Sequence, residues 1–383
     1  MMAIKAFIAD RLFDGGRIAR DQALLVEDGR VRAVVGPGGI PESAARETIA
    51  ADLVAPGFVD LQVNGGGGVL LGGDTTLEGV RTICATHARH GTTAILPTLI
   101  TESAQATDHA IETVRAAIAT RVPGCLGLHM EGPHLSVARK GAHDPALIRP
   151  MDAADFARVT STGIGHVLLT VAAETVPAHQ IARLAAAGVT VSIGHSDAPA
   201  ALVLEAADAG ARLVTHLFNA MSPLGHREPG VVGAALGHGG LSCGLIADGF
   251  HVHPLAIHAA LAAKAGPGSI FLVSDAMHAF GAPGDTFTLN GRTIYRRAGR
   301  LTLEDGTLAG ADIDLAGCVR FLVETVGVER AQALAMATAL PAKAIGAEAS
   351  HGRLAPGTRA DFVALSADHA VTGVWVGGEP VAR

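Results

Sequence analysis

Thr190-Val-Ser-Ile-Gly-His195 and Arg212-Leu-Val-Thr-His216 are two short apolar runs that each end in a histidine. Between them, Ala198 to Gly210 is rich in Ala and Leu and closes with a glycine, which is typical of a helix packed on one face. The order strand, helix, strand predicts two parallel strands. Because the carboxyl ends of parallel strands meet at one mouth of a (β/α)₈ barrel, both histidines are expected where such barrels assemble their active sites.

His195 and His216 therefore form the starting point for a metal-site hypothesis. The alternative is a pair of hydrogen-bonded core histidines, because histidine is often half-buried. Two histidines at the ends of neighbouring strands favour the metal site, since imidazole is a common metal ligand.

The composition fits one large barrel with a smaller appendage. The chain has 383 residues, of which 49% are hydrophobic, 48 are glycine and only 17% are charged, so it can bury a large core. A net charge of −7 without a basic run argues against a nucleic-acid partner.

Two further observations concern the location of the protein. Asp10 and Arg11 come too early for a secretory leader, and no apolar stretch is long enough to span a bilayer. We therefore expect a cytoplasmic protein without a membrane partner. The cysteines show no paired spacing and are expected to be small apolar fillers rather than a disulfide frame or zinc site: Cys84, Cys125, Cys243 and Cys318.

Both ends of the chain alternate short β-rich runs with turns. Asp28-Gly29 separates two such runs and predicts a hairpin. Neither end has enough strands for a domain of its own, and chain termini often lie close together. Residues 1–54 and 355–383 are thus predicted to form one small structural β-sandwich.

Residues 55–354 show the βα rhythm of a barrel, with an apolar run about every thirty residues. A β-hairpin insert is predicted near residues 285–310, because Leu289-Asn-Gly291 and Glu304-Asp-Gly306 are turn signals. The eight predicted strands are Phe58–Val63, Thr92–Pro97, Leu126–Glu131, His166–Val171, Val189–His195, Arg212–His216, Leu241–Ala247 and Ile270–Asp275.

Carboxylates end two of these runs. Glu131 with His195 and His216 gives the His₂Glu set of a catalytic zinc site with an open position for water. Asp275 then remains as a general base. The alternatives are that Glu131 is satisfied by turn amides and that Asp275 caps a following helix.

The first barrel run ends with two amides and a glycine run. Gln62 and Asn64 are candidates for second-site or water contacts, or are turn-forming amides. The glycines from Gly65 to Gly68 let the backbone pass close to a ligand.

Eight segments in this order together resemble the N-acetylglucosamine-6-phosphate deacetylase family of the amidohydrolase superfamily, over nearly the whole chain. Each segment alone is weak evidence for this family, and the combination in this order is highly specific for it. They are Ala55-Pro-Gly-Phe-Val-Asp-Leu-Gln-Val-Asn-Gly65, Glu131-Gly-Pro133, Lys140-Gly-Ala-His143, Gly194-His-Ser196, Thr215-His-Leu-Phe-Asn-Ala-Met221, Arg227-Glu-Pro-Gly230, Ala247-Asp-Gly-Phe-His251 and Ser274-Asp-Ala276.

The resemblance implies one divalent metal ion per subunit, held by Glu131, His195 and His216, with Asp275 as the catalytic residue. Zinc is the expected metal, with Fe²⁺, Co²⁺ or Mn²⁺ as alternatives. It also implies a homodimer in which Arg227 reaches the neighbouring site. The implied substrate contacts are Ala142, His143, Asn219, Ala220, Arg227, His251, Leu308, Ala309 and Gly310.

The implied reaction converts N-acetyl-D-glucosamine 6-phosphate to D-glucosamine 6-phosphate and acetate, in amino-sugar catabolism and cell-wall recycling. A divalent ion makes hydroxide available near neutral pH. Asp275 would then accept the water proton and pass it to the departing amine. His143 and His251 are expected to donate hydrogen bonds to the carbonyl or sugar hydroxyls, or are loop-surface imidazoles. Arg227 suits the phosphate, or forms a surface salt bridge with Glu228.

After the eighth predicted strand, the sequence Met277-His-Ala-Phe280 differs from the Thr-Ala-Pro-Ala-Gly pattern of the family. The resemblance therefore assigns no sugar contact to this segment.

Two other classes of protein remain as alternatives. A cyclic amidase or deaminase of the same superfamily usually has His-x-His after the first strand and often a bridging lysine after the fourth. Here the corresponding segments are Gln62-Val-Asn64 and Leu168-Leu-Thr-Val-Ala-Ala-Glu174. A non-enzymatic barrel that senses sugar phosphates has no need to keep Glu131, both histidines and Asp275 together.

Overall fold

The computed structural model describes residues 4–289 and 291–382. Some residues of the predicted elements lie outside the described residues. They are the first three residues of the chain and Asn290 of the predicted Leu289–Gly291 turn. The chain forms two compact units, one of residues up to 60 with 85–94 and 314–383, the other of residues 61–84 and 95–313. The predicted domain limits, 1–54 with 355–383 and 55–354, stay predictions.

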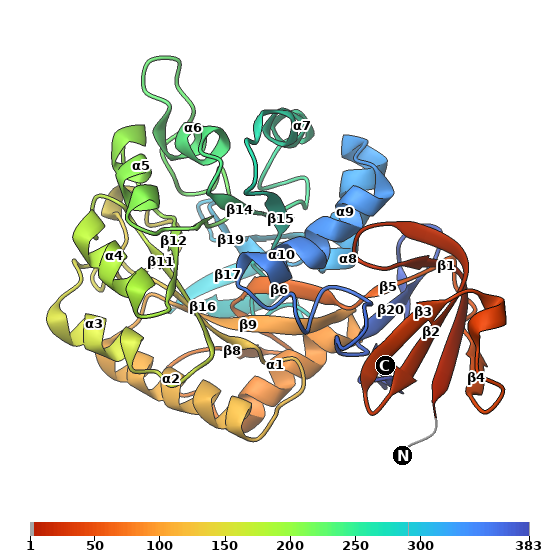
Figure 1. The fold of residues 1–383 in the computed structure, drawn as a ribbon. Helices are drawn as coiled ribbons and strands as arrows, with labels where there is room; N and C mark the ends of the chain where they lie inside the picture. Colours follow the sequence, from red (N-terminus) through yellow and green to blue (C-terminus); the bar gives the residue numbers. More distant parts are fainter. Residues whose placement is uncertain (1–3, 290, 383) are drawn as a thin grey trace. The chain divides into compact units, whose positions relative to one another are not determined.

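The predicted barrel is confirmed as an eight-stranded parallel sheet with helices outside it (Figure 1). An isolated parallel bridge joins Val63, the last residue of the first strand, to Ala276, in the segment that follows the last strand, so the barrel is nearly closed. In sheet order its strands are β6 (Phe58–Val63), β9 (Thr92–Ile100), β10 (Gly127–Glu131), β11 (His166–Val171), β12 (Thr190–Ile193), β13 (Leu213–Val214), β14 (Ser242–Leu245) and β15 (Ile270–Leu272).

The strands β12, β13 and β15 are shorter than predicted at their carboxyl ends. They stop at Ile193, Val214 and Leu272. The apolar pattern continues past these residues although the strand pairing does not, because the following backbone turns toward the mouth of the barrel. The functional candidates His195, His216 and Asp275 lie in these turns.

The helices follow the alternation seen in the sequence. Figure 1 shows α2 to α7 outside the barrel strands. α2 begins at a serine cap, with Ser103 accepting the N–H of Ala106 at 3.2 Å. None of the described helices is long and apolar enough to cross a membrane. They are α1 (Leu77–Arg89), α2 (Ala104–Ala119), α3 (Ala153–Thr160), α4 (Ala178–Ala186), α5 (Ala200–Asp208), α6 (Gly230–Gly237), α7 (Pro254–Ala263), α8 (Leu315–Phe321), α9 (Arg330–Ala337) and α10 (Ala339–Ala344).

The predicted insert is a four-stranded antiparallel sheet after the last barrel strand. Its buried side chains Leu289, Ile294 and Leu301 pack in one cluster with Met277 and Ala309. This cluster forms a wall beside the mouth of the barrel. The strands are β16 (Thr286–Leu289), β17 (Arg292–Arg297), β18 (Arg300–Thr302) and β19 (Leu308–Ala311), and a short pair, β7 (Gly65–Gly66) and β8 (Val69–Leu70), follows β6.

Strands from the two chain ends pair in one mixed sheet, which confirms the prediction that both ends build a single β-structure. Asp28 and Gly29 join β2 to β3 with positive φ angles of 51° and 73°, which is the backbone that a tight hairpin needs. Phe7 and Phe362 are among the side chains of its core. Its strands are β1 (Lys5–Phe13), β2 (Ile18–Glu27), β3 (Arg30–Val35), β4 (Ala45–Thr48), β5 (Leu53–Pro56), β20 (Phe362–Leu365), β21 (Val371–Val376) and β22 (Glu379–Pro380).

Candidate active site

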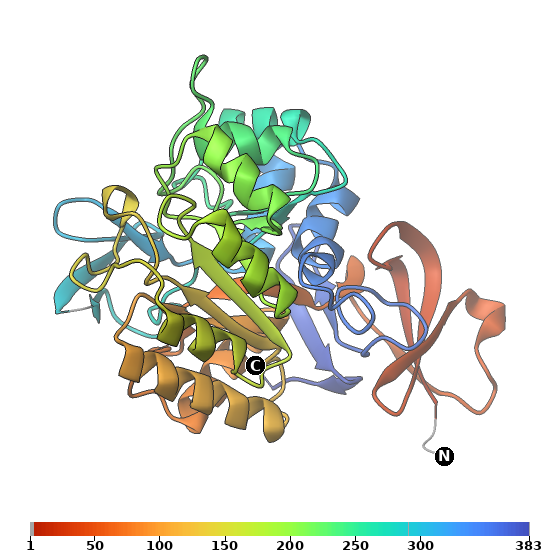
Figure 2. The ribbon, with the colours of Figure 1, turned by 60° about the vertical axis from the view of Figure 1, so that its left-hand side comes forward.

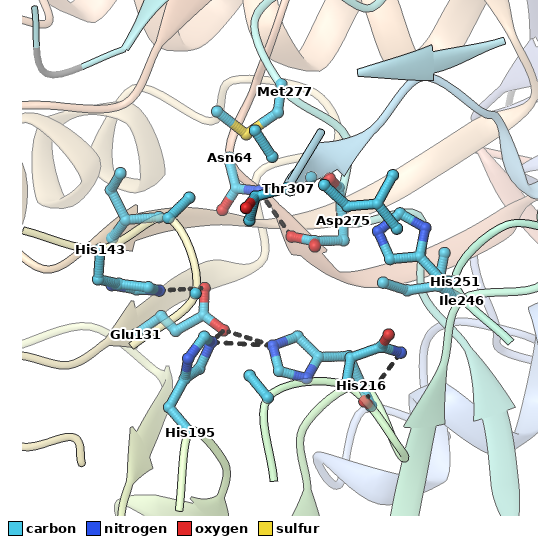
Figure 3. A pocket seen from close by; sticks show the side chains of 18 of the residues that line it. Asn64, Glu131, His143, His195, His216, Ile246, His251, Asp275, Met277 and Thr307 are labelled. Carbon is cyan, nitrogen blue, oxygen red and sulfur yellow. Dashed lines mark hydrogen bonds and ion pairs between the residues drawn. The ribbon is translucent and has the colours of Figure 1, made fainter. Parts of the chain in front are cut away.

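Glu131, His195 and His216 meet at the mouth of the barrel, as the sequence predicted (Figure 3). Oε1 of Glu131 lies 3.2 Å from Nε2 of His195 and 3.1 Å from Nε2 of His216. The two Nε2 atoms are 3.0 Å apart. All three side chains are buried. Three buried ligand atoms that converge on one point are the donor set of a divalent metal site.

The orientation of His195 fits a metal ligand. Its Nδ1 donates a hydrogen bond to the carbonyl oxygen of Arg139 at 2.8 Å, because a carbonyl can only accept. In the neutral ring this leaves a lone pair on Nε2, the atom that faces Glu131 and His216. A backbone partner on the other ring nitrogen is the usual second contact of a metal-binding histidine.

The backbone is strained at three of the candidate residues. His195, His216 and Asp275 have φ angles of 46°, 27° and 52°. Residues other than glycine are uncommon in this left-handed region, and such strain concentrates at functional sites. Each of these residues lies two or three positions after the end of a barrel strand, so the strained turn aims its side chain into the mouth.

Glu131 stays ionised in this site. Burial raises its pKa, but hydrogen bonds and charge interactions with His195 and His216 outweigh burial and hold the pKa well below its usual range. Turn amides are not its main partners, because Gln62, His195 and His216 surround Oε1. A buried carboxylate beside two imidazole nitrogens is suited to a cation.

Asp275 is held by the two amides that follow strand β6. Asn64 Nδ2 donates to Asp275 Oδ1 at 2.7 Å, and Gln62 Nε2 donates to the same oxygen at 3.2 Å. Gln62 Nε2 also lies 3.0 Å from Glu131 Oε1. Burial and the nearby charge of Glu131 raise the pKa of Asp275, which is the direction expected of a general base that later acts as an acid. The helix-cap alternative is wrong, because the residues that directly follow Asp275 form a bridge and turns, and the next helix, α8, begins only at Leu315.

His143 is a buried donor at the edge of the site. The backbone N–H of Thr101 donates to its Nδ1 at 3.2 Å, so the proton of the neutral ring is on Nε2. Burial and the neighbouring His195 lower its pKa to about 3. Nε2 lies 3.7 Å from Oε2 of Glu131. His143 is therefore a neutral imidazole that presents an N–H to the site, not a loop-surface residue.

His251 is fixed by a carboxylate. Its Nδ1 lies 2.6 Å from Oδ2 of Asp248, which also accepts the backbone N–H groups of Phe250 and His251 through Oδ1. Burial raises the pKa of Asp248, but the His251 contact lowers it overall. His251 lines the pocket at the side of Asp275 (Figure 3).

These residues line one pocket of about 370 Å³, which is large enough for a sugar phosphate. Of the substrate contacts implied by the resemblance, all except Arg227 line it: Ala142, His143, Asn219, Ala220, His251, Leu308, Ala309 and Gly310.

Arg227 lies outside this pocket. It is exposed, in the green loop that stands out before α6 (Figures 1 and 2). The described residues show no ion pair between Arg227 and Glu228, so the alternative of a surface salt bridge is wrong. Oε1 of Glu228 accepts the backbone N–H groups of Ala200 and Gly230, at 2.8 and 3.0 Å.

The segment Met277-His-Ala-Phe280, which differs from the family pattern, contributes one residue to the pocket, Met277. A Cβ at Gly310 would lie 2.5 Å from Met277 Cγ, and Gly310 has a φ of 70°, so this close approach requires glycine. Sequence reasoning missed Met277 and also Arg139, which lines the same pocket. The only signal for Arg139 was a basic pair, Arg139-Lys140, directly before Gly141.

A family model described as the amidohydrolase family matches residues 53–381. The chain belongs to the amidohydrolase family. This amidohydrolase is 39% identical to the N-acetylgalactosamine-6-phosphate deacetylase of Shewanella sp. (strain ANA-3), over 97% of this chain and 95% of the relative. It is 32% identical to the N-acetylglucosamine-6-phosphate deacetylase of Haemophilus influenzae, over 94% of this chain and 95% of the relative. The crystal structure of N-acetylglucosamine-6-phosphate deacetylase from Pasteurella multocida matches with a TM-score of 0.94 and 33% identity, covering 99% of this chain and 100% of that chain.

Proposed function

We propose that this amidohydrolase hydrolyses the acetamide of N-acetyl-D-glucosamine 6-phosphate to give D-glucosamine 6-phosphate and acetate. The observation that supports this most directly is Asp275, with its raised pKa, beside the Glu131, His195 and His216 set in one pocket. Relatives named for this activity match nearly the whole chain.

Glu131, His195 and His216 are proposed to hold one divalent ion, with zinc as the first candidate and Fe²⁺, Co²⁺ or Mn²⁺ as alternatives. Such an ion lowers the pKa of water and polarises an amide carbonyl. Gln62 and Asn64 donate to carboxylates rather than offering imidazoles, which favours one ion over two.

Asp275 is the proposed proton carrier. An amine leaves an amide carbon badly unless it is protonated, so one group must accept a proton from water and then deliver it to the amine nitrogen. Asn64 and Gln62 hold Oδ1 of Asp275. The other carboxylate oxygen is then the one that exchanges the proton.

Two neutral groups are proposed to position the substrate. Nε2–H of His143 donates to the acetamide oxygen, where negative charge develops during attack. Oδ1 of Asn64 is buried and has no hydrogen-bond partner among the described residues. It is therefore available to accept from a donor on the substrate, such as the amide N–H.

Arg227 is proposed to act in a homodimer. It is exposed on a projecting loop and does not line the pocket of its own chain. A two-fold axis would let each copy place this loop at the site of the other.

The galactosamine epimer is a second candidate substrate, because a relative with 39% identity is named for it. The test is a substrate panel. Acetate release is measured with N-acetylglucosamine 6-phosphate, N-acetylgalactosamine 6-phosphate and the unphosphorylated sugars, with metal analysis of the same sample. Release from the glucosamine derivative supports the proposal, and release from the epimer alone replaces it with the second candidate. No release from either phosphate, with metal bound, contradicts the proposed function and favours a sensor or another amidase. We also propose a cytoplasmic location, in keeping with a substrate from amino-sugar metabolism.

A further inference from the structure

Arg139 is a cation at the edge of the pocket that the reaction above does not use. It is the last residue of the short 3₁₀ helix Val137–Arg139, in the segment after β10. Among the residues that the structure describes, no other lysine or arginine lines the pocket. A phosphorylated substrate brings a charge of about −1.5 to −2 into this space, so the source of the compensating positive charge matters.

The guanidinium of Arg139 is oriented by one hydrogen bond, and its other N–H groups are available. Its Nε donates to Oδ1 of Asp197 at 2.7 Å, which is its one side-chain hydrogen bond within the described part of the chain. The side chain of Arg139 is 35% exposed and that of Asp197 is 46% exposed. An arginine has five N–H donors, so both terminal nitrogens remain available for an anion.

The backbone of Arg139 fixes its distance from the site. Its carbonyl oxygen accepts the hydrogen bond of His195 at 2.8 Å, and Ser136 N–H donates to the carbonyl of His195 at 2.8 Å. Arg139 is therefore tied at both ends to the segment from His195 to Asp197.

The next strand end provides a second feature that suits phosphate. Phe218 and Ala220, after β13, have φ angles of 78° and 50°. Left-handed residues of this kind can turn backbone N–H groups toward one side, as in anion-binding concavities. The N–H of Asn219 donates to the carbonyl of His216 at 2.9 Å, so the N–H of Ala220 is the one that could face an anion. Asn219 and Ala220 line the same pocket as Arg139.

We propose that Arg139 binds the 6-phosphate of the substrate within its own chain, in the pocket that it lines together with Asn219 and Ala220, which the family resemblance already gives as substrate contacts. This inference rests on the proposed function. A planar guanidinium that is held through Nε presents its two terminal nitrogens as a fork, which matches two phosphate oxygens. Asp197 sets the plane of that fork. Arg227 would contribute from a second copy, whereas Arg139 acts without one.

The test compares Arg139→Met with Lys140→Met, which removes a charge from the neighbouring residue that does not line the pocket. For N-acetylglucosamine 6-phosphate, Arg139→Met is expected to raise KM roughly 10- to 100-fold, the effect of losing hydrogen bonds to a charged group, with kcat changed far less. For unphosphorylated N-acetylglucosamine, Arg139→Met and wild type should have the same kcat/KM. Lys140→Met should resemble wild type with both sugars.

Asp197→Asn separates phosphate binding from loop positioning. It breaks the ion pair but keeps the guanidinium, so the preference for the phosphorylated sugar should persist. Arg139→Met and Asp197→Asn could both lose bound metal, and could both lose kcat to the same extent with either sugar. In that case Arg139 only supports His195 and the inference is wrong. An unchanged KM in Arg139→Met also contradicts it.

Calorimetric binding of glucosamine 6-phosphate, with glucosamine as the unphosphorylated control, measures the contact without turnover. If wild type releases no acetate, the proposed function fails on its own, and this binding still tests Arg139. Weaker binding of the phosphate alone in Arg139→Met supports the inference, whereas equal binding by wild type and variant contradicts it.

Discussion

The side-chain amide of Asn64 donates a hydrogen bond to Oδ1 of Asp275 at 2.7 Å, across 211 positions of the sequence. Asn64 follows the first strand of the barrel and Asp275 follows the last. The two meet because the barrel nearly closes through the bridge of Val63 with Ala276. Closure of the barrel therefore places the proposed base beside Glu131 and fixes which of its oxygens is free.

One tightly bound divalent ion per chain is the first expected outcome. Glu131→Gln should lower bound metal well below one equivalent, because a neutral amide replaces the charged ligand. His179→Gln, an exposed histidine on α4, is the control and should keep the metal. Elemental analysis after gel filtration measures both. Two equivalents that are lost together with activity would contradict a single-metal site.

Asp275→Asn should keep the metal and lose turnover by roughly 10²- to 10⁴-fold, because an amide cannot carry the proton. Asp285→Asn, which changes an exposed carboxylate after the same strand, is the matched control. Both variants are compared by acetate release per bound metal. Near-normal turnover of Asp275→Asn would move the base elsewhere, and His143 is the next candidate.

Co-expression tests whether Arg227 acts across a dimer. Arg227→Ala and Asp275→Asn should each be nearly inactive. In a mixed dimer, one site collects both defects and the other has neither, so random pairing should restore roughly a quarter of wild-type activity. The control pair, Glu131→Gln with Asp275→Asn, changes two residues of the same site and should restore nothing. A verified mixed dimer that stays inactive would rule out the shared site.

Asp155 is expected to stabilise the barrel in a pH-dependent way. Its buried carboxylate accepts hydrogen bonds from Arg149 and Arg158 and caps the start of α3 with Asp152. Burial raises its pKa, but Arg149 and the backbone N–H of Asp152 lower it overall to about 2. A depressed pKa in the folded state contributes stability above the unfolded pKa near 4 and loses it toward pH 2.

Asp155→Asn should therefore lower the free energy of unfolding by about 2 kcal/mol or more at pH 7, and the difference from wild type should shrink below about pH 4. Asp108→Asn, which removes an exposed partner of Arg158, should change it by less than about 1 kcal/mol. Urea denaturation at pH 7, 5 and 3.5 measures both variants. A constant difference over this range would show that the charge of Asp155 is not responsible.

The sequence by itself determined the barrel and the three residues of its candidate metal site. Alternating apolar runs and Ala-rich segments have only a few packing solutions, and the strand ends of a parallel barrel share one mouth. Glu131, His195 and His216 could therefore be grouped without coordinates, since polar groups at the ends of buried runs need partners. The hairpin at Asp28-Gly29 could also be predicted from the sequence, because its turn is a local property of the backbone.

Only the tertiary structure decided how these residues are oriented. The hydrogen bonds of Asn64 with Asp275 and of His195 with the Arg139 carbonyl join segments far apart in the chain, and no local pattern records them. The left-handed backbone of His195 and Asp275 is strained, so propensity argues against it and only the surrounding packing maintains it. Arg227 and Arg139 both lie in connections that follow barrel strands. That Arg139 lines the pocket and Arg227 does not depends on how those connections fold over the barrel.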